Sequence, residues 1–186
     1  SRVGEASTDL LHYVQLQEAA FDLADSVQGR VYQQDYQEER IYQDTLLSLA
    51  KAVANATAAL VGDAKVVAQH TDDQMQKQYV IGAATNSGLA TSQLVTCTKV
   101  LAPTIAQRAC QDQLMEACRD VADATDGVVD SCHSAAADNQ QLILEIDQSA
   151  GQVREALDEL LKHIQNAPHH NAHGAGCDTM VESFMS

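Results

Sequence analysis

One pattern of apolar and small residues occurs three times along the chain, each time within a long segment of helical periodicity. The copies run over residues 46–64, 80–98 and 114–132. Within each copy, the apolar or small positions recur at steps of three and four residues, which places them on one face of an α-helix. The pattern therefore predicts three amphipathic helices, each of which buries a narrow face lined with small side chains.

Residues 8–28 and 139–166 show further helical periodicity, so five helices are expected in all, over residues 8–28, 41–69, 73–101, 109–135 and 139–166. Gly29 can end the first helix, Thr71-Asp72-Asp73 and Asp138-Asn139 supply N-cap residues, and Pro103 and Pro168 prevent the preceding helices from continuing. The short connections require successive helices to run antiparallel. We therefore predict an all-α fold, an up-and-down four-helix bundle with an additional C-terminal long helix.

The helices suggest a division of the chain. Residues 1–136 are expected to form the four-helix bundle, and residues 137–166 either open the next bundle or pack as a fifth helix. Residues 167–177 are rich in His, Gly and Ala, which is typical of a linker. Residues 178–186 resemble the truncated start of a further helix.

Composition narrows the classes of function. The 186 residues carry a net charge of -15, which disfavours nucleic acid, and only 4% of them are aromatic. Because uninterrupted apolar runs stay short of the roughly 18 residues that span a bilayer, no direct membrane insertion is expected. The start lacks the features of a signal peptide, so we expect a cytoplasmic protein. The five cysteines form no CxxC pair, and free thiols are expected.

The sequence offers no chemistry for catalysis, because it contains no phosphate-binding Gly-rich loop, no HExxH and no GxSxG. We therefore expect no enzyme activity and no cofactor. One cluster contains residue types that can ligate a metal ion, and its members are His163, His169, His170, His173 and Cys177. Its composition is typical of a tether, so no metal site is predicted.

The three repeats place a threonine at the centre of each face, at Thr57, Thr91 and Thr125. Their spacing of 34 residues is that of a tetratricopeptide repeat, but each period here contains one uninterrupted helix instead of two. An up-and-down bundle would place the three hydroxyls at one level, as a core threonine layer. Such a layer is either tolerated at a tight crossing or softens the bundle so that it opens under load.

The repeated face resembles the vinculin-binding consensus of the talin family, L-x-x-A-A-x-x-V-A-x-x-V-x-x-L-I-x-x-A. Continuous stretches are also similar to the N-terminal part of the talin rod, and the resemblance covers about residues 41–166. The stretches are Leu49-Ala50-Lys51-Ala52-Val53-Ala54, Ala90-Thr91-Ser92-Gln93-Leu94-Val95, Cys97-Thr98-Lys99-Val100, Ala102-Pro103-Thr104-Ile105, Cys110-Gln111-Asp112-Gln113-Leu114 and Ala156-Leu157-Asp158-Glu159-Leu160-Leu161. By this resemblance, the chain would contain the second rod bundle and the first helix of the next.

The resemblance implies a mechanosensitive cytoskeletal adaptor that links integrin adhesions to actin through other parts of the full-length protein. Its cryptic helices would bind the vinculin head when force opens the bundle, at cell-matrix adhesion sites in the cytoplasm. The alternative is a constitutive helical spacer of an adhesion protein, without a cryptic site in this segment.

Two candidate vinculin-binding faces follow from the consensus. The first choice comprises Leu46, Leu49, Ala50, Val53, Ala54, Thr57, Leu60, Val61 and Ala64. The second choice comprises Val80, Ala83, Ala84, Thr91, Leu94, Val95 and Thr98. In the second, Ser87 and Gly88 replace the expected Val-Ala. The face over residues 114–132 ranks third, because Gly127 beside its centre lowers helix propensity.

Overall fold

The structure is a computed structural model that describes the backbone of residues 2–167 and the side chains of residues 33–167. It contains four α-helices: α1 (Arg2–Gln69), α2 (Gln74–Leu101), α3 (Arg108–Ala135) and α4 (Gln140–Gln165). A short 3-10 helix, η1 (Ala102–Thr104), follows α2. Residues 2–167 include no strand, so the predicted all-α class is confirmed.

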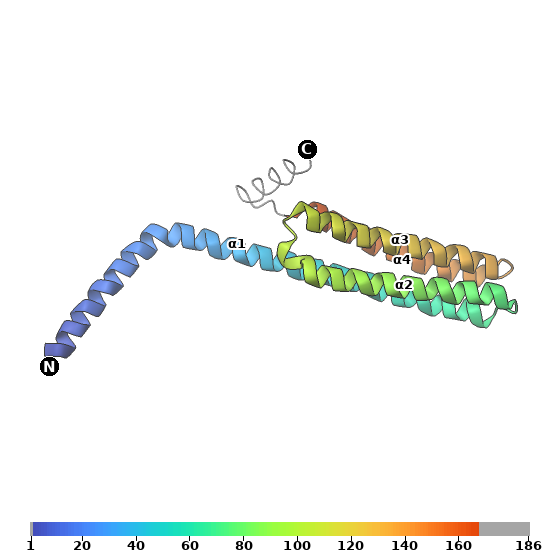
Figure 1. The fold of residues 1–186 in the computed structure, drawn as a ribbon, viewed down its shortest axis with the longest axis horizontal. Helices are drawn as coiled ribbons and strands as arrows, with labels where there is room; N and C mark the ends of the chain where they lie inside the picture. The colour runs from blue at the N-terminus through green and yellow to red at the C-terminus, as the bar shows by residue number, and fades with distance from the viewer. Residues whose placement is uncertain (1, 168–186) are drawn as a thin grey trace. The chain divides into compact units, whose positions relative to one another are not determined.

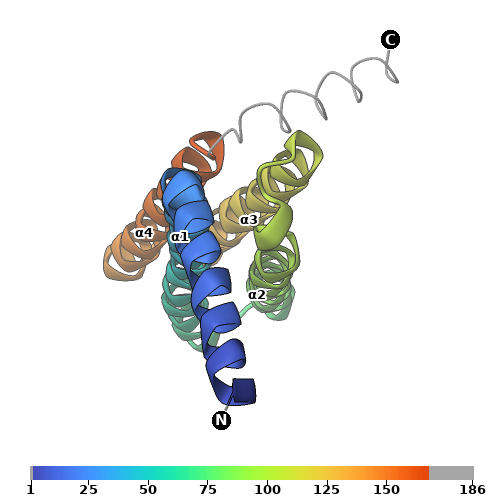
Figure 2. The same ribbon diagram turned by 90° about the vertical axis from the view of Figure 1, so that its left-hand side faces the viewer.

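The chain divides into two compact units, the first ending at Ile41 and the second starting at Tyr42. The second unit contains the last part of α1 together with α2, α3 and α4, which run alternately up and down (Figures 1 and 2). The start of the unit and the last turn of α4 lie at one pole, where Tyr42 contacts His163, and the connections that follow α1 and α3 lie at the other (Figure 1). We call these ends the terminal pole and the loop pole.

Local chemistry explains where the helices begin. The Asp73 carboxylate accepts hydrogen bonds from the backbone N–H groups of Met75 at 2.9 Å and Gln76 at 3.3 Å, which caps α2. Asn139 caps α4 in the same way, through the N–H of Leu142 at 3.2 Å. Both caps were expected from the sequence.

The core of the second unit runs along its whole length and is built from one buried stripe of each helix. Its largest completely buried side chains are aliphatic, and they come from all four helices. They include Leu46, Leu60, Leu94, Leu114, Ile146, Leu160 and Ile164. This continuous apolar core holds the helices side by side.

Two features of the structure concern the expected division of the chain, which stays a prediction. Gly29 does not end a helix, since α1 continues through it to Gln69. Residues 137–166 lie in the same compact unit as residues 42–136, so no boundary between the units falls at residue 136. The expected linker at 167–177 and the expected helix start at 178–186 fall, apart from Ala167, outside the described residues.

One stretch of the described helices, Gln33–Gln69, is long and apolar enough to cross a membrane by length and composition alone. Uninterrupted apolar runs did not reveal it, because its apolar residues are interspersed with polar ones. The same criterion is met by core helices of soluble proteins, so it is weak evidence for a membrane span. Here Leu46, Val53 and Leu60 of this stretch are completely buried in the bundle.

Two helical glycines, Gly62 in α1 and Gly127 in α3, have open space where a Cβ atom would lie. We expect Gly62→Ala and Gly127→Ala each to raise the free energy of unfolding by about 0.5–1 kcal/mol, because alanine lowers the entropy of the unfolded chain without a clash. Urea unfolding followed by circular dichroism measures the effect. The reverse exchange at an exposed position, Ala59→Gly, should lower the stability by a similar amount. A loss of stability in either glycine variant would contradict the open space around these positions.

Candidate binding face and the polar interior

The first-choice face lies on α1 and points into the bundle. The buried members of this face are Leu46, Ala50, Val53, Thr57, Leu60 and Ala64. The partly buried members are Leu49, Ala54 and Val61. Leu49 and Val61 also pack against the core. The whole predicted face is therefore part of the contact between α1 and its neighbours in the second unit.

The second-choice face, on α2, also points into the bundle. Its buried members are Val80, Ala84, Thr91, Leu94 and Thr98, and its partly buried members are Ala83 and Val95. The third-ranked face on α3 is also inward, with Leu114, Cys118, Val121, Thr125, Val128 and Cys132 buried. All three copies of the sequence pattern thus contribute to one core.

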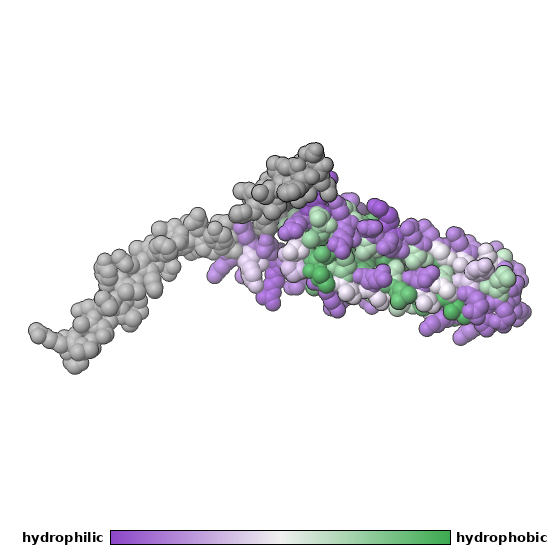
Figure 3. Space-filling view, in the orientation of Figure 1, coloured by the Kyte–Doolittle hydropathy of each residue, from purple (hydrophilic) through white to green (hydrophobic). Residues whose placement is uncertain are grey.

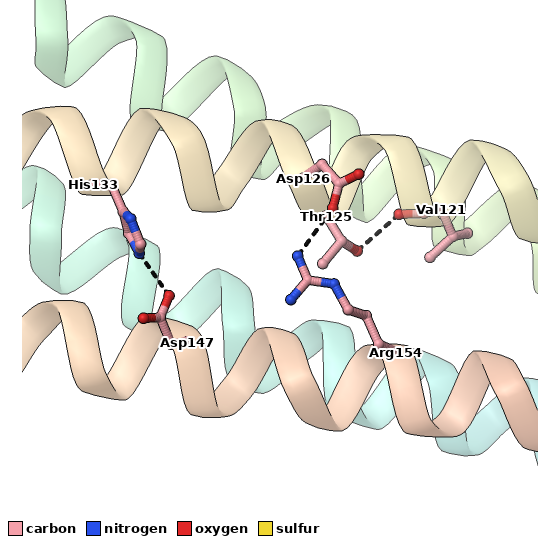
Figure 4. A network of polar contacts seen from close by, with 6 residues as sticks. All are labelled: Val121, Thr125, Asp126, His133, Asp147 and Arg154. Carbon is pink, nitrogen blue, oxygen red and sulfur yellow. Dashed lines mark hydrogen bonds and ion pairs between the residues drawn. The ribbon is translucent and has the colours of Figure 1, made fainter.

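The predicted threonines are all buried, and their hydroxyls find different partners. Thr91 donates a hydrogen bond to the hydroxyl of Thr57 across the α1–α2 contact, at 3.1 Å. Thr125 instead donates to the backbone oxygen of Val121 in its own helix, at 2.8 Å (Figure 4). Thr57 and Thr91 therefore form a pair, whereas Thr125 satisfies its hydroxyl locally.

Three further hydroxyls lie in the interior: Thr98 belongs to the second-choice face, whereas Ser87 and Ser149 were not predicted as functional residues. Thr98 donates to the backbone oxygen of Leu94 at 2.7 Å. Ser149 of α4 donates to the carboxylate of Asp63 in α1. The Ser87 hydroxyl is completely buried and has no hydrogen-bond partner. The departure of Ser87 from the consensus was visible in the sequence, but only the structure shows that its oxygen is left unpaired.

Helix α2 has few polar contacts with its neighbours in the second unit. Its two charged residues are Lys77 and Lys99, and it contains no acidic residue although the chain as a whole has an excess of them. Large apolar side chains are exposed on it, and hydrophobic patches follow it in Figure 3. These side chains are Met75, Tyr79, Ile81, Leu89 and Val100. Both faces of α2 are therefore poor in charge.

The space beside α2 is loosely filled. A groove of about 450 Å³ lies between α1 and α2, lined by Val61, Val80 and Gly88 among others. A second groove, of about 420 Å³, lies along α2 next to Gln113 of α3 and is lined by Leu89 and Val100 among others. Among residues 33–167, no side-chain hydrogen bond joins α2 to α3, and the Thr57–Thr91 bond is the polar tie to α1.

The other helix pairs are held by charged or aromatic contacts. Two ion pairs link α3 to α4: His133 with Asp147 at 2.6 Å, and Arg154 with Asp126 at 2.9 Å (Figure 4). Their side chains are roughly half exposed, so each contributes little to stability. They join α3 and α4 at two levels along the helices.

Comparison with known proteins identifies the family. The family model of the talin IBS2B domain matches residues 71–167. The chain is 50% identical over 124 residues to talin-1 of Gallus gallus, and 46% identical over the same length to talin-2 of Mus musculus and of Homo sapiens. These matches cover 67% of the chain and 5% of each relative.

The chain belongs to the talin family.

In this talin rod segment, two of the four cysteines in the described residues lie in the core. Cys118 and Cys132 are buried and free, and burial raises the pKa of each thiol to about 12, with smaller contributions from Cys97 and Asp63 respectively. Burial also raises the pKa of Cys97. Both buried thiols thus act as small apolar side chains at neutral pH.

The candidate metal ligands are not assembled by the described part of this talin segment. His163 lies at the end of α4 against Tyr42, and its four proposed partners fall outside the described residues. Within the described residues, no group of three or more His, Cys, Asp or Glu side chains is arranged to hold a metal ion.

The unpaired hydroxyl of Ser87 gives a direct test of the polar interior. We expect Ser87→Ala to raise the free energy of unfolding by about 1 kcal/mol, because alanine removes a buried oxygen that has lost its hydration. Thermal unfolding would show a rise in Tm of several degrees. As a control, Ser92→Ala on the exposed side of the same helix should leave Tm almost unchanged.

The Thr57–Thr91 pair should show coupling in a double-mutant cycle. Thr91→Val alone leaves Thr57 without its cross-helix partner, so we expect a loss of about 1 kcal/mol. Thr57→Val together with Thr91→Val replaces both hydroxyls by methyl groups and should restore or exceed the parent stability. Thr125→Val should add independently, since its hydroxyl bonds within its own helix. If the changes in the free energy of unfolding caused by Thr57→Val and Thr91→Val add exactly in urea unfolding, the hydrogen bond between them does not contribute to stability.

Proposed function

We propose that this talin segment is a mechanosensitive adaptor module in which α1 binds the head domain of vinculin once the bundle has opened. Its whole protein would link integrin adhesions to actin through other parts, in the cytoplasm at cell-matrix adhesion sites. The supporting observation is that the consensus-like residues of α1 are the same side chains that α1 buries in the core.

The double use of these side chains makes the site cryptic. Leu46, Val53 and Leu60 have no exposed surface in the closed bundle. They cannot contact the core and the groove of a partner at once, so binding requires α1 to separate from its neighbours. A groove that binds an amphipathic helix contacts residues spaced by three and four positions, which are the same residues that a helix buries in a bundle core.

The cost of opening sets the affinity of the closed chain. A bundle that requires about 5 kcal/mol to open would bind three to four orders of magnitude more weakly than the isolated helix. Tension lowers this cost, because the open chain is longer than the closed one. The hydroxyl-lined contact between α1 and α2 supports the proposal, since it keeps the cost of separating α1 moderate.

The face of α2 is a second candidate for the same partner. Its inward positions fit the consensus less well, with Ser87 and Gly88 at its centre. Its outer side favours engulfment by a partner, however, because only two charged residues, Lys77 and Lys99, would have to lose their hydration. The alternative function, a constitutive helical spacer, requires neither helix to bind.

Isolated peptides distinguish the adaptor from the spacer. We expect a peptide of residues 41–70 to bind the vinculin head about a thousandfold more tightly than the folded chain does, in a calorimetric or fluorescence titration. Ala50→Glu in the peptide should abolish binding, because it places a charge in the centre of the face. The matched change Ala59→Glu, at an exposed position of the same helix, should preserve binding.

A peptide of residues 73–102 tests α2 in parallel. Failure of both peptides to bind would reject the cryptic site and leave the spacer function. Equal binding by the folded chain and the 41–70 peptide would reject the masking, because the face would then be available in the closed bundle.

A further inference from the structure

A reciprocal contact between Tyr42 and His163 joins the two ends of the second unit. The Tyr42 hydroxyl donates to the backbone oxygen of His163. In return, Nε2 of His163 lies 3.0 Å from the backbone oxygen of Tyr42. Since a carbonyl oxygen only accepts, Nε2 carries the proton and donates. The two rings also stack, with centroids 4.0 Å apart and an angle of 16° between their planes. We call this contact the terminal clasp.

In the clasp, Tyr42 is buried and His163 is partly buried. Tyr42 is 9% exposed, and burial raises the pKa of its phenol to about 12, so the hydroxyl remains a neutral donor at physiological pH. Each residue contributes one side-chain donor and one backbone acceptor, so the two hydrogen bonds can form at the same time. A stacked pair with two reciprocal hydrogen bonds is more specific than the apolar contacts around it.

The position of the clasp determines the order in which the contacts of the unit break under tension. Tyr42 is the first residue of the second unit, and His163 lies in the last turn of α4. Tension through the residues before 42 and after 167 therefore pulls α1 and α4 apart from the terminal pole. Contacts then break one after another along the helices, beginning with the one nearest the pulled ends.

We propose that the terminal clasp is the mechanical latch of this bundle, the first contact that tension must break before the inward face of α1 is uncovered. The proposal rests on the proposed function for its biological meaning, because it describes how the cryptic face is controlled. The mechanical property itself requires no partner protein.

A matched contact elsewhere on the same pair of helices serves as the control. Ser149 of α4 donates to Asp63 of α1, so it too joins α1 and α4 by a side-chain hydrogen bond. It lies about 30 Å from Tyr42 along α1, at 1.5 Å per residue. Tension from the terminal pole reaches it only after the helices have separated over that length.

Single-molecule stretching of the full chain tests the latch. With handles at residues 1 and 186, we expect Tyr42→Phe to raise the rate of first opening of the bundle at constant force about threefold to tenfold, through loss of one hydrogen bond with the ring retained. Ser149→Ala should change this rate by less than about twofold. His163→Phe keeps an aromatic ring but removes the Nε2 donor, and should act in the same direction as Tyr42→Phe.

The direction of pulling separates a latch from a general stabilising contact. With handles inserted after Asp72 and after Asp138, at the loop pole, Tyr42→Phe should leave the rate of first opening within about twofold. Equal effects of Tyr42→Phe in both geometries, equal effects of Tyr42→Phe and Ser149→Ala, or no effect of either clasp variant would overturn the proposal. These rates are measured without vinculin, so a failed latch and a failed cryptic site give different results.

Discussion

The whole structure depends on one constraint: each helix of the second unit has a single narrow face to bury, and the four faces can be buried only against one another. The faces of α1, α2 and α3 follow the same three- and four-residue steps, with a threonine near the middle of each. Small side chains allow the helices to approach closely, while the hydroxyls keep the interior from being uniformly apolar. The stability of the unit and the concealment of α1 are therefore consequences of the same contacts.

The buried hydroxyls are unevenly distributed among the helices. Half of the buried positions of α2 are hydroxyl residues, namely Ser87, Thr91 and Thr98. Helix α2 is also bordered by two grooves and, within the described residues, takes part in no ion pair. By contrast, α4 is joined to α1 by the Tyr42–His163 and Ser149–Asp63 contacts and to α3 by two ion pairs. The α1–α4 and α3–α4 contacts thus contain more polar interactions than either contact of α2.

Much of this architecture was predictable from periodicity, because a face that repeats every three or four residues must be buried if the helix is stable. The helix bounds at Asp73, Pro103 and Asn139 followed from capping and from the geometry of proline. The sequence pattern did not show where α4 packs, because an apolar stripe indicates that a helix face is buried but does not identify the helix against which it packs. Gly29 was a plausible stop, but a glycine in a helix costs only about 1 kcal/mol and does not force an end.

The polar contacts between helices were the least predictable part of the site. Tyr42 and His163 lie 121 residues apart in the sequence, and neither belongs to a recognisable motif. Their pairing depends on the register of α1 against α4, which many distributed core contacts set together. Once that register is fixed, the two ends of the unit emerge side by side, and tension applied through them must act on the nearest contact first. In the proposed latch, control of the buried face of α1 lies at the pole through which tension is applied, so a few residues there would govern the rate of opening even though most of the stability lies in the core.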